Sequence, residues 1–162
     1  MNIWFFIILV VALALVLGPI SMLKPKPAQK RRENLRLYAN QRGVRYTLRR
    51  PPVLSTDIEQ PEPMPVYYLP PAAKTPTESE WILMRTHYVH EGNFYQEWDW
   101  QTATRPCDDV CQCLKIYLPD LPASVIAITQ GSLGICVFWS EKEDKETLEL
   151  LIDMMEKLRQ LT

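Results

Sequence analysis

The sequence predicts an α+β domain attached to a single N-terminal transmembrane helix. Three observations lead to this class. An uncharged apolar segment opens the chain at Ile3–Leu23. Short segments with the alternation typical of β-strands begin at Val44 and pair around glycine-containing turns. A helix with one apolar stripe closes the chain. We therefore expect residues 44–162 to form a small domain with a mostly antiparallel sheet of four to six strands and two or three helices.

The first predicted element is a membrane anchor over residues 1–23. Its twenty-one residues from Ile3 to Leu23 carry no charge, and Ile3–Leu17 is an unbroken apolar run. At about 1.5 Å per residue, this length matches a hydrocarbon core of about 30 Å. The segment lacks the basic start and the small-residue cleavage site of a signal peptide, so we expect it to be retained as a transmembrane helix.

Basic residues follow this anchor, whereas the chain before it has none. Six of them are predicted to lie at the membrane surface: Lys24, Lys26, Lys30, Arg31, Arg32 and Arg36. Basic residues beside a membrane helix are retained in the cytoplasm, which predicts an inner-membrane protein with its N-terminus outside and its C-terminal domain in the cytoplasm. Residues 24–50 hold ten basic residues and one acidic residue, whereas residues 51–162 hold eight basic and eighteen acidic residues. The positive charge is therefore concentrated near the predicted membrane.

Residues 24–43 are predicted to form a basic juxtamembrane helix. Ala28–Arg42 contains neither proline nor glycine, and Gly43 suits a left-handed helix cap. Such a helix could lie on anionic lipid headgroups, or its charges could serve only to fix topology. Nucleic acid is not an expected partner, because no aromatic residues for base stacking alternate with the arginines.

A short stretch near the N-terminus resembles a known membrane exit. The apolar segment ends in Leu23-Lys24-Pro25, and Gln29-Lys30-Arg31-Arg32-Glu33 and Leu35 follow. This pattern of about 25 residues resembles YajC, the small accessory subunit of the bacterial Sec preprotein translocase. The resemblance implies one transmembrane helix, a small cytoplasmic domain and association with the SecDF complex. Farther along, YajC-like chains continue into a Gly-rich stretch, whereas Gly43 stands alone here.

The first predicted strands lie on both sides of a proline-rich segment. Val44–Arg50 alternates between apolar and polar residues, as a half-buried strand does. Residues 51–76 hold eight of the fourteen prolines and are predicted to form a loop within the domain. Val66–Leu69 is an exception, which we interpret as an edge strand, where a neighbouring proline is tolerated.

A hairpin is predicted from two aromatic-rich segments. Trp81–His87 and Phe94–Trp100 flank a turn that contains Gly92. Trp98 and Trp100 would then share one face of a strand. Aromatic side chains in this arrangement more often pack in a core than form a ligand platform, so packing is the favoured interpretation.

Four cysteines supply the number of thiols that a structural zinc site or an iron–sulfur cluster needs. They are Cys107, Cys111, Cys113 and Cys136. Their spacing contains no Cys-x-x-Cys knuckle, and Asp108 and Asp109 would raise the pKa of a neighbouring thiol. Free thiols without a cofactor are therefore the favoured interpretation, with a metal site and thiol chemistry as alternatives.

The last third of the chain has the most regular pattern. Val110–Leu118 is predicted to be a short helix, and Ser124–Thr129 with Gly134–Trp139 is predicted to be a hairpin at the centre of the sheet. Ser140 and Glu143 have the spacing of a capping box. The helix that follows carries an apolar stripe expected to cover the sheet: Leu148, Leu151, Ile152, Met155 and Leu158.

The sequence contains no catalytic signature. It has no pair of carboxylates at a spacing typical of catalytic sites, no Ser-His-Asp order and no phosphate-binding glycine loop. We therefore predict a non-catalytic accessory or scaffold subunit of a bacterial inner-membrane complex. Its expected partners are the lipid bilayer and other integral membrane proteins, with Sec translocase components as candidates and no small-molecule substrate. The alternative is a membrane-tethered protein that uses its four cysteines for thiol or metal chemistry.

Overall fold

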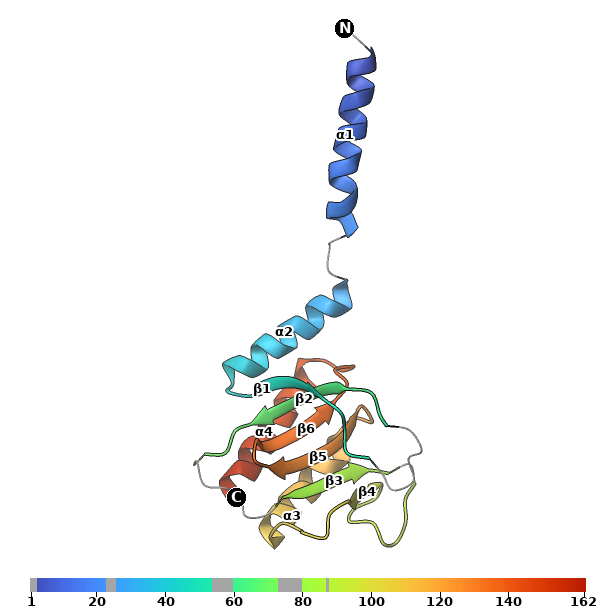
Figure 1. The fold of residues 1–162 in the computed structure, drawn as a ribbon. Helices are drawn as coiled ribbons and strands as arrows, with labels where there is room; N and C mark the ends of the chain where they lie inside the picture. Colours follow the sequence, from blue (N-terminus) through green and yellow to red (C-terminus); the bar gives the residue numbers. More distant parts are fainter. Residues whose placement is uncertain (1–2, 23–25, 54–59, 73–79, 87) are drawn as a thin grey trace. The chain divides into compact units, whose positions relative to one another are not determined.

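A computed structural model describes residues 3–22, 26–53, 60–72, 80–86 and 88–162, with side chains left out for residues 16–22. The chain divides into two compact units, Met1–Glu33 and Asn34–Thr162. Figure 1 labels the helices and strands of both units. The second unit contains the sheet, and the boundary between the units falls within helix α2 (Pro27–Gln41).

Helix α1 (Ile3–Met22) occupies the segment predicted to cross a membrane. Among the residues that the structure describes, no helix combines the length and the apolar character needed to cross a membrane. The predicted transmembrane helix over residues 1–23, and with it the single-pass arrangement, is therefore wrong.

Helix α2 confirms the predicted basic helix. It begins with Pro27, whose fixed φ angle suits the first helical position. It ends in a Schellman motif, in which the Val44 amide donates to the Ala39 carbonyl at 2.9 Å and the Gly43 amide donates to Asn40 at 3.0 Å. Gly43 has the left-handed φ of 79° that this cap requires. Val44 and Ala39 are both fully buried, so the cap also contributes to the core.

Within the described residues, six antiparallel strands form one sheet in the order β1-β2-β6-β5-β3-β4. Their bounds are β1 (Arg45–Arg49), β2 (Met64–Leu69), β3 (Trp81–Arg85), β4 (Trp98–Trp100), β5 (Val125–Gly131) and β6 (Gly134–Trp139). The α+β class, the antiparallel sheet and the central β5–β6 hairpin are confirmed. The β3–β4 pairing is confirmed too, although β4 has only three residues.

Strand β2 is an inner strand, so its prediction as an edge strand is wrong. It pairs with β1 on one side and with β6 on the other. Its pairing with β6 runs from Val66 to Leu69 and leaves out Pro65. The proline therefore lies where no β6 residue requires its missing amide hydrogen, and the sheet tolerates it away from an edge.

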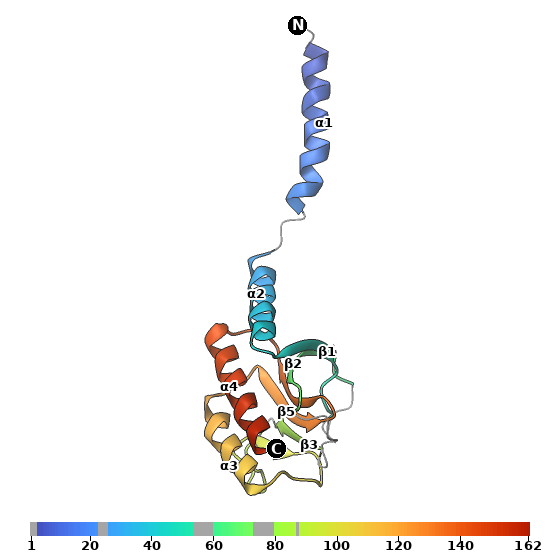
Figure 2. The same ribbon diagram turned by 90° about the vertical axis from the view of Figure 1, so that its left-hand side faces the viewer.

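Helices α3 (Asp108–Tyr117) and α4 (Lys145–Leu161) lie side by side against one face of the sheet (Figure 2). The short 3-10 helix η1 (Leu118–Asp120) follows α3 directly. Tyr117 on α3 donates a hydrogen bond to the Asp153 carboxylate on α4. Burial and this contact raise the pKa of Tyr117 to about 12, so the hydroxyl stays protonated and joins the two helices at neutral pH.

The two faces of the sheet bury apolar residues unequally. The helix-covered face holds the main core, in which the apolar stripe of α4 is fully buried as predicted. The opposite face holds a smaller cluster, defined here as the second cluster, of Val66, Met84, Ala127, Cys136 and Phe138. Partly buried side chains such as Tyr68 and Ile82 surround it. This asymmetry matters for the surfaces that the domain can present to a partner.

The predicted capping box at Ser140 and Glu143 is wrong. Helix α4 begins at Lys145, and Asp144 occupies the N-cap position. The Glu143 carboxylate instead accepts hydrogen bonds from Ser124 and from the Trp139 indole, the latter at 2.7 Å. Burial acts to raise the pKa of Glu143, but these two hydrogen bonds, a backbone hydrogen bond and the charge of Lys142 lower it, and the net pKa is lowered. The carboxylate is used to connect β6 to the start of β5 rather than to cap a helix.

Gly134 at the start of β6 supplies a test of this fold. It has a φ of 88°, and a Cβ added there would lie 2.1 Å from the Leu69 carbonyl oxygen. We expect Gly134→Ala to lower the free energy of unfolding by about 3 kcal/mol, because backbone must move to relieve the clash. Gly131→Ala is the matched control, since its Cβ would meet only the flexible Glu80 side chain at 3.3 Å. Denaturant unfolding followed by tryptophan fluorescence measures both, and equal effects would contradict this geometry.

Candidate functional site

The most distinctive constellation of the domain is a buried ion pair. The Arg36 guanidinium donates from Nε to Glu141 Oε1 at 2.8 Å and from Nη2 to Oε2 at 2.7 Å. Tyr67 donates its hydroxyl to Glu141 Oε1 at 2.7 Å. Glu141 is completely buried, whereas the Arg36 side chain keeps 33% exposure. This bidentate geometry is the strongest way in which a protein holds a buried carboxylate.

Three elements of the second unit bring these groups together. Arg36 comes from α2, where the neighbouring Leu35 is buried against the core. Tyr67 comes from β2, and Glu141 comes from the segment between β6 and α4. Glu141 has a φ of 55°, which is uncommon outside glycine and persists only where its surroundings enforce it. The hydrogen bonds to the buried Glu141 carboxylate hold the residue in this conformation.

Aromatic rings extend the ion pair into the core. The Arg36 guanidinium lies 4.1 Å from the centroid of the Tyr46 ring on β1. Tyr46 packs edge-on against Tyr67 at 5.8 Å, and Tyr67 packs against Trp139 of β6 at 5.5 Å. The cation–π contact and the two ring contacts together join α2, β1, β2 and β6. We refer to Arg36, Glu141, Tyr67 and Tyr46 as the α2 clamp.

Arg36 and Tyr67 both keep their protons at neutral pH. Burial, followed by the contact with Glu141, raises the pKa of Tyr67 far above its usual value. The hydrogen bonds to Glu141 raise the pKa of Arg36. A general acid or base requires a pKa near the working pH, and neither group meets that condition. The arrangement is suited to holding α2 in place.

A second arginine fastens the opposite part of the sheet. Arg85 on β3 donates to the carbonyl oxygens of Val125 and Leu121 at 3.0 Å and of Pro122 at 3.1 Å. It also pairs with Glu97, and it lies 4.6 Å from the centroid of the Trp98 ring. Burial lowers the pKa of Arg85. Because its donors bind backbone carbonyls, this arginine acts as a structural tie between β3 and the start of β5.

The four cysteines occupy three different surroundings. Cys107 is exposed at the N-cap of α3, and Cys111 and Cys113 are partly buried against the main core. Cys136 is buried in the second cluster, on the opposite face of the sheet. Within the part of the chain that the structure describes, no three His, Cys, Asp or Glu residues are grouped to hold a metal ion. The structure therefore does not bring the four predicted thiols into one site.

The surroundings of the buried thiols also disfavour thiolate chemistry. Burial raises the pKa of Cys111, and Asp108 adds to that effect. Burial likewise raises the pKa values of Cys113 and Cys136. Reactive cysteines have lowered pKa values in electropositive surroundings, which is the opposite situation.

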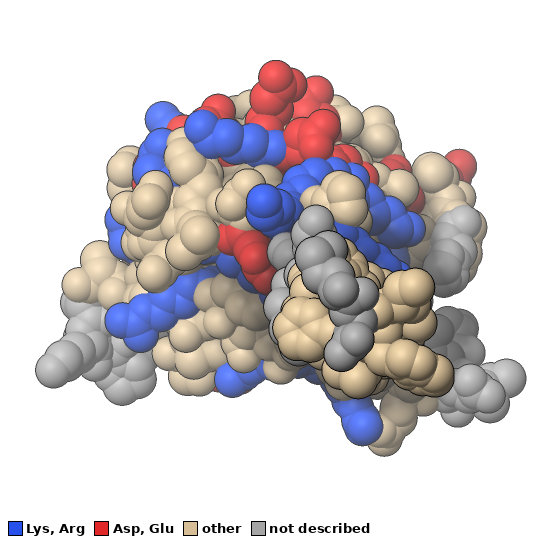
Figure 3. Space-filling model, turned by 90° about the horizontal axis from the view of Figure 1, so that it is seen from above, with Lys and Arg blue, Asp and Glu red and all other residues tan. Residues whose placement is uncertain are grey.

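The residues predicted to lie at a membrane surface have different positions. Lys24 lies outside the described residues, whereas Lys26, Lys30 and Arg32 are exposed. Arg31 is partly buried, and Arg36 belongs to the α2 clamp. Figure 3 shows basic and acidic side chains close to each other on one face, with acidic ones gathered along its upper edge.

The aromatic pair on β4 packs in the core, which confirms the favoured interpretation. Trp98 and Trp100 are buried in the main core, and Trp100 packs edge-on against Trp81 with ring centroids 5.6 Å apart. Among the described residues, neither indole nitrogen of the pair has a hydrogen-bond partner. Both rings are enclosed by protein, so they offer no exposed platform for a ligand.

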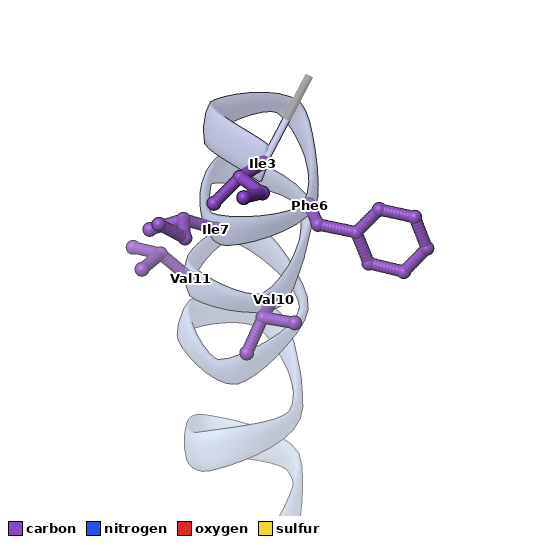
Figure 4. A pocket seen from close by; sticks show the side chains of 5 residues that line it. All are labelled: Ile3, Phe6, Ile7, Val10 and Val11. Atoms are coloured by element: carbon purple, nitrogen blue, oxygen red, sulfur yellow. The ribbon is translucent and has the colours of Figure 1, made fainter. Parts of the chain in front are cut away.

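An apolar groove runs along the exposed side of α1. Its lining residues have the i, i+3, i+4, i+7, i+8 spacing of one helical face: Ile3, Phe6, Ile7, Val10 and Val11. Figure 4 shows the Phe6 ring on one side of the helix and Ile7 with Val11 on the other. The groove lies within the first unit and is lined by apolar side chains, so it can contact apolar material.

Comparisons with family models, with curated proteins and with solved structures found no match for this chain. The functional argument therefore depends on the residues themselves. They provide a structural clamp, separated thiols and an exposed apolar helix.

The positions of the cysteines predict an order of chemical modification. At pH 7.5, iodoacetamide should alkylate the exposed Cys107 first, Cys111 and Cys113 more slowly, and the buried Cys136 only after unfolding. Because raised pKa values keep Cys111 and Cys113 protonated, their rates should increase as the pH rises through 9. Peptide mass spectrometry over a time course measures the order. Rapid labelling of Cys111 or Cys113 at pH 6 would reveal an activated thiol and contradict this assignment.

Proposed function

We propose that this protein is a non-catalytic accessory or scaffold protein that associates with the cytoplasmic face of a bacterial inner membrane. In this proposal α1 and the basic residues after it attach the protein to lipid. The domain of residues 34–162 then presents its surfaces to a protein partner.

The exposed apolar surface of α1 is the observation that carries the proposal. Ile3 and Trp4 are 76% and 75% exposed, and Phe5 is 67% exposed. Apolar residues occur on every side of this helix, and such a helix is stable only where other apolar groups surround it. A contiguous apolar surface of this kind marks a site of interaction with lipid or protein.

The charges that follow α1 favour lipid as the first contact. Lys26, Lys30 and Arg32 are exposed, and they lie within the first turns of α2 or directly before it. Each basic residue near an anionic bilayer contributes about 1 kcal/mol to binding. An apolar helix next to several basic residues therefore combines the two forces that hold proteins at anionic membranes.

The domain supports a binding role more than a catalytic one. Its buried charged groups hold secondary structure together, as the α2 clamp and Arg85 illustrate. Its thiols are distributed over both faces of the sheet, which weakens the alternative of thiol or metal chemistry. Attachment to a membrane raises the effective concentration of such a domain near membrane proteins. Integral membrane proteins are thus the proposed partners, with Sec translocase components as candidates because of the resemblance to YajC.

Vesicle flotation of the full chain tests the membrane attachment. The protein should float with vesicles that contain anionic phosphatidylglycerol, and the double variant Phe6→Asp, Val10→Asp should not, because charge opposes contact with acyl chains. The variant Lys26→Glu, Lys30→Glu, Arg32→Glu should bind at least tenfold more weakly.

The matched controls keep the chemistry of each segment. Phe6→Leu with Val10→Leu, and Lys26→Arg with Lys30→Arg, should bind as the unchanged protein does. If the unchanged chain stays with the soluble fraction, or if the Asp variant floats equally well, the proposed attachment is wrong.

A further inference from the structure

Strand β1 lies at one end of the sheet and has β2 as its neighbour in the strand order. It provides five residues of extended chain, whereas β4 at the other end provides three. Arg45, Leu48 and Arg49 on this strand are exposed. An edge of this length offers backbone hydrogen-bonding groups to which another extended chain can add.

The register with β2 shows which way the β1 side chains point. Arg45 is opposite Tyr68, and Arg49 is opposite Met64. Tyr68 and Met64 both pack on the second cluster, away from the helices. Since directly opposed residues share a face of a sheet, both arginines lie on that face, with Thr47 between them.

The alternate residues of β1 lie on the helix-covered face. Tyr46 is opposite Tyr67, which belongs to the main core. Leu48 is opposite Pro65 and is 59% exposed although it is apolar. The edge therefore presents two positive side chains on one face and two largely apolar side chains on the other.

We propose that the β1 edge binds an extended acidic segment of a partner protein as an added strand. Acidic side chains of the segment lie beside Arg45 and Arg49, and apolar side chains at the intervening positions lie beside Tyr46 and Leu48. Side chains on adjacent strands are about 5 Å apart, close enough for ion pairs and apolar contacts. The recognised pattern is thus acidic and apolar residues in alternation, without proline.

A second copy of the chain fits this edge poorly. Two β1 strands paired antiparallel about Thr47 would place Arg45 of each copy opposite Arg49 of the other. Like charges in directly opposed positions are destabilising, and basic residues on edge strands oppose association of identical edges. The same arginines that reject another copy attract an acidic segment, which gives the edge its specificity.

The α2 clamp holds this edge in position before any partner arrives. Arg36 contacts the Tyr46 ring at 4.1 Å, and Tyr46 packs against Tyr67. An edge strand that is already ordered loses little conformational entropy on binding, so more of the interaction energy appears as affinity.

Fluorescence anisotropy with the full chain in a mild detergent tests the proposal. The probe is a labelled nine-residue peptide in which Glu and Val alternate, and its counterpart alternates Lys and Val. We expect saturable binding of the Glu peptide and binding of the Lys peptide that is at least tenfold weaker. The double variant Arg45→Glu, Arg49→Glu should reverse this preference, because it replaces two exposed positive side chains by negative ones. Arg105→Glu, at an exposed position before α3, is the control and should leave binding unchanged.

A third peptide separates strand addition from simple charge attraction. It has the Glu-Val sequence and is prepared in two forms, with N-methyl groups either on every Glu or on every Val, so each form lacks amide hydrogens along one edge of its backbone. One of the two forms should not bind to the unchanged protein. Equal binding of both methylated forms, or absence of binding by the unmodified Glu peptide, would overturn the proposal. A dimer of the chain that persists in the presence of the Glu peptide would also overturn the proposal, because a second copy would then occupy the edge.

Discussion

The architecture of the domain depends on one buried electrostatic contact, the bidentate pair between Arg36 and Glu141. A carboxylate without exposure to solvent requires a cation and further donors, and Arg36 and Tyr67 provide them. Since the arginine comes from α2 and the carboxylate from the segment before α4, the pair fastens the second half of α2 to the sheet. Removal of either partner would leave the other charge uncompensated, so α2 and the domain are expected to behave as one cooperative structure from Asn34 onward.

This constraint also determines what the domain can do. The clamp uses Arg36, Glu141 and Tyr67 to attach α2 to the sheet. By ordering Tyr46, it prepares β1 as an exposed edge on which two arginines alternate with two largely apolar residues. Apolar residues on α1 supply a separate surface for a different environment. The protein thus combines an attachment segment with a pre-ordered recognition edge, a division of roles that suits an accessory protein.

The sequence predicted the elements with strong local signals. Gly43 after an uninterrupted helical segment predicted a left-handed helix cap, and two near-continuous apolar strands predicted the central hairpin. Long-range partners were not predictable, because nothing local distinguishes Glu141 from the acidic residues that follow it. Glu143 was assigned to a cap although Ser124 and Trp139 bind it, and Arg36 was assigned to a membrane surface although it contacts a residue 105 positions away. The count of four cysteines left a metal site open as an alternative, but Cys136 lies on the opposite face of the sheet from Cys111 and Cys113.

A double-mutant cycle on Arg36 and Glu141 tests the central claim most directly. The variants Arg36→Met, Glu141→Gln and their combination are compared with the unchanged chain by denaturant unfolding. A buried bidentate pair predicts a coupling free energy of about 2 kcal/mol. The exposed pair Arg42 and Glu156, whose closest charged atoms are 3.9 Å apart, serves as the control cycle and should give less than about 0.5 kcal/mol. Equal, small coupling energies in the two cycles would contradict the account, because the Arg36–Glu141 pair would then not be what holds α2 in place.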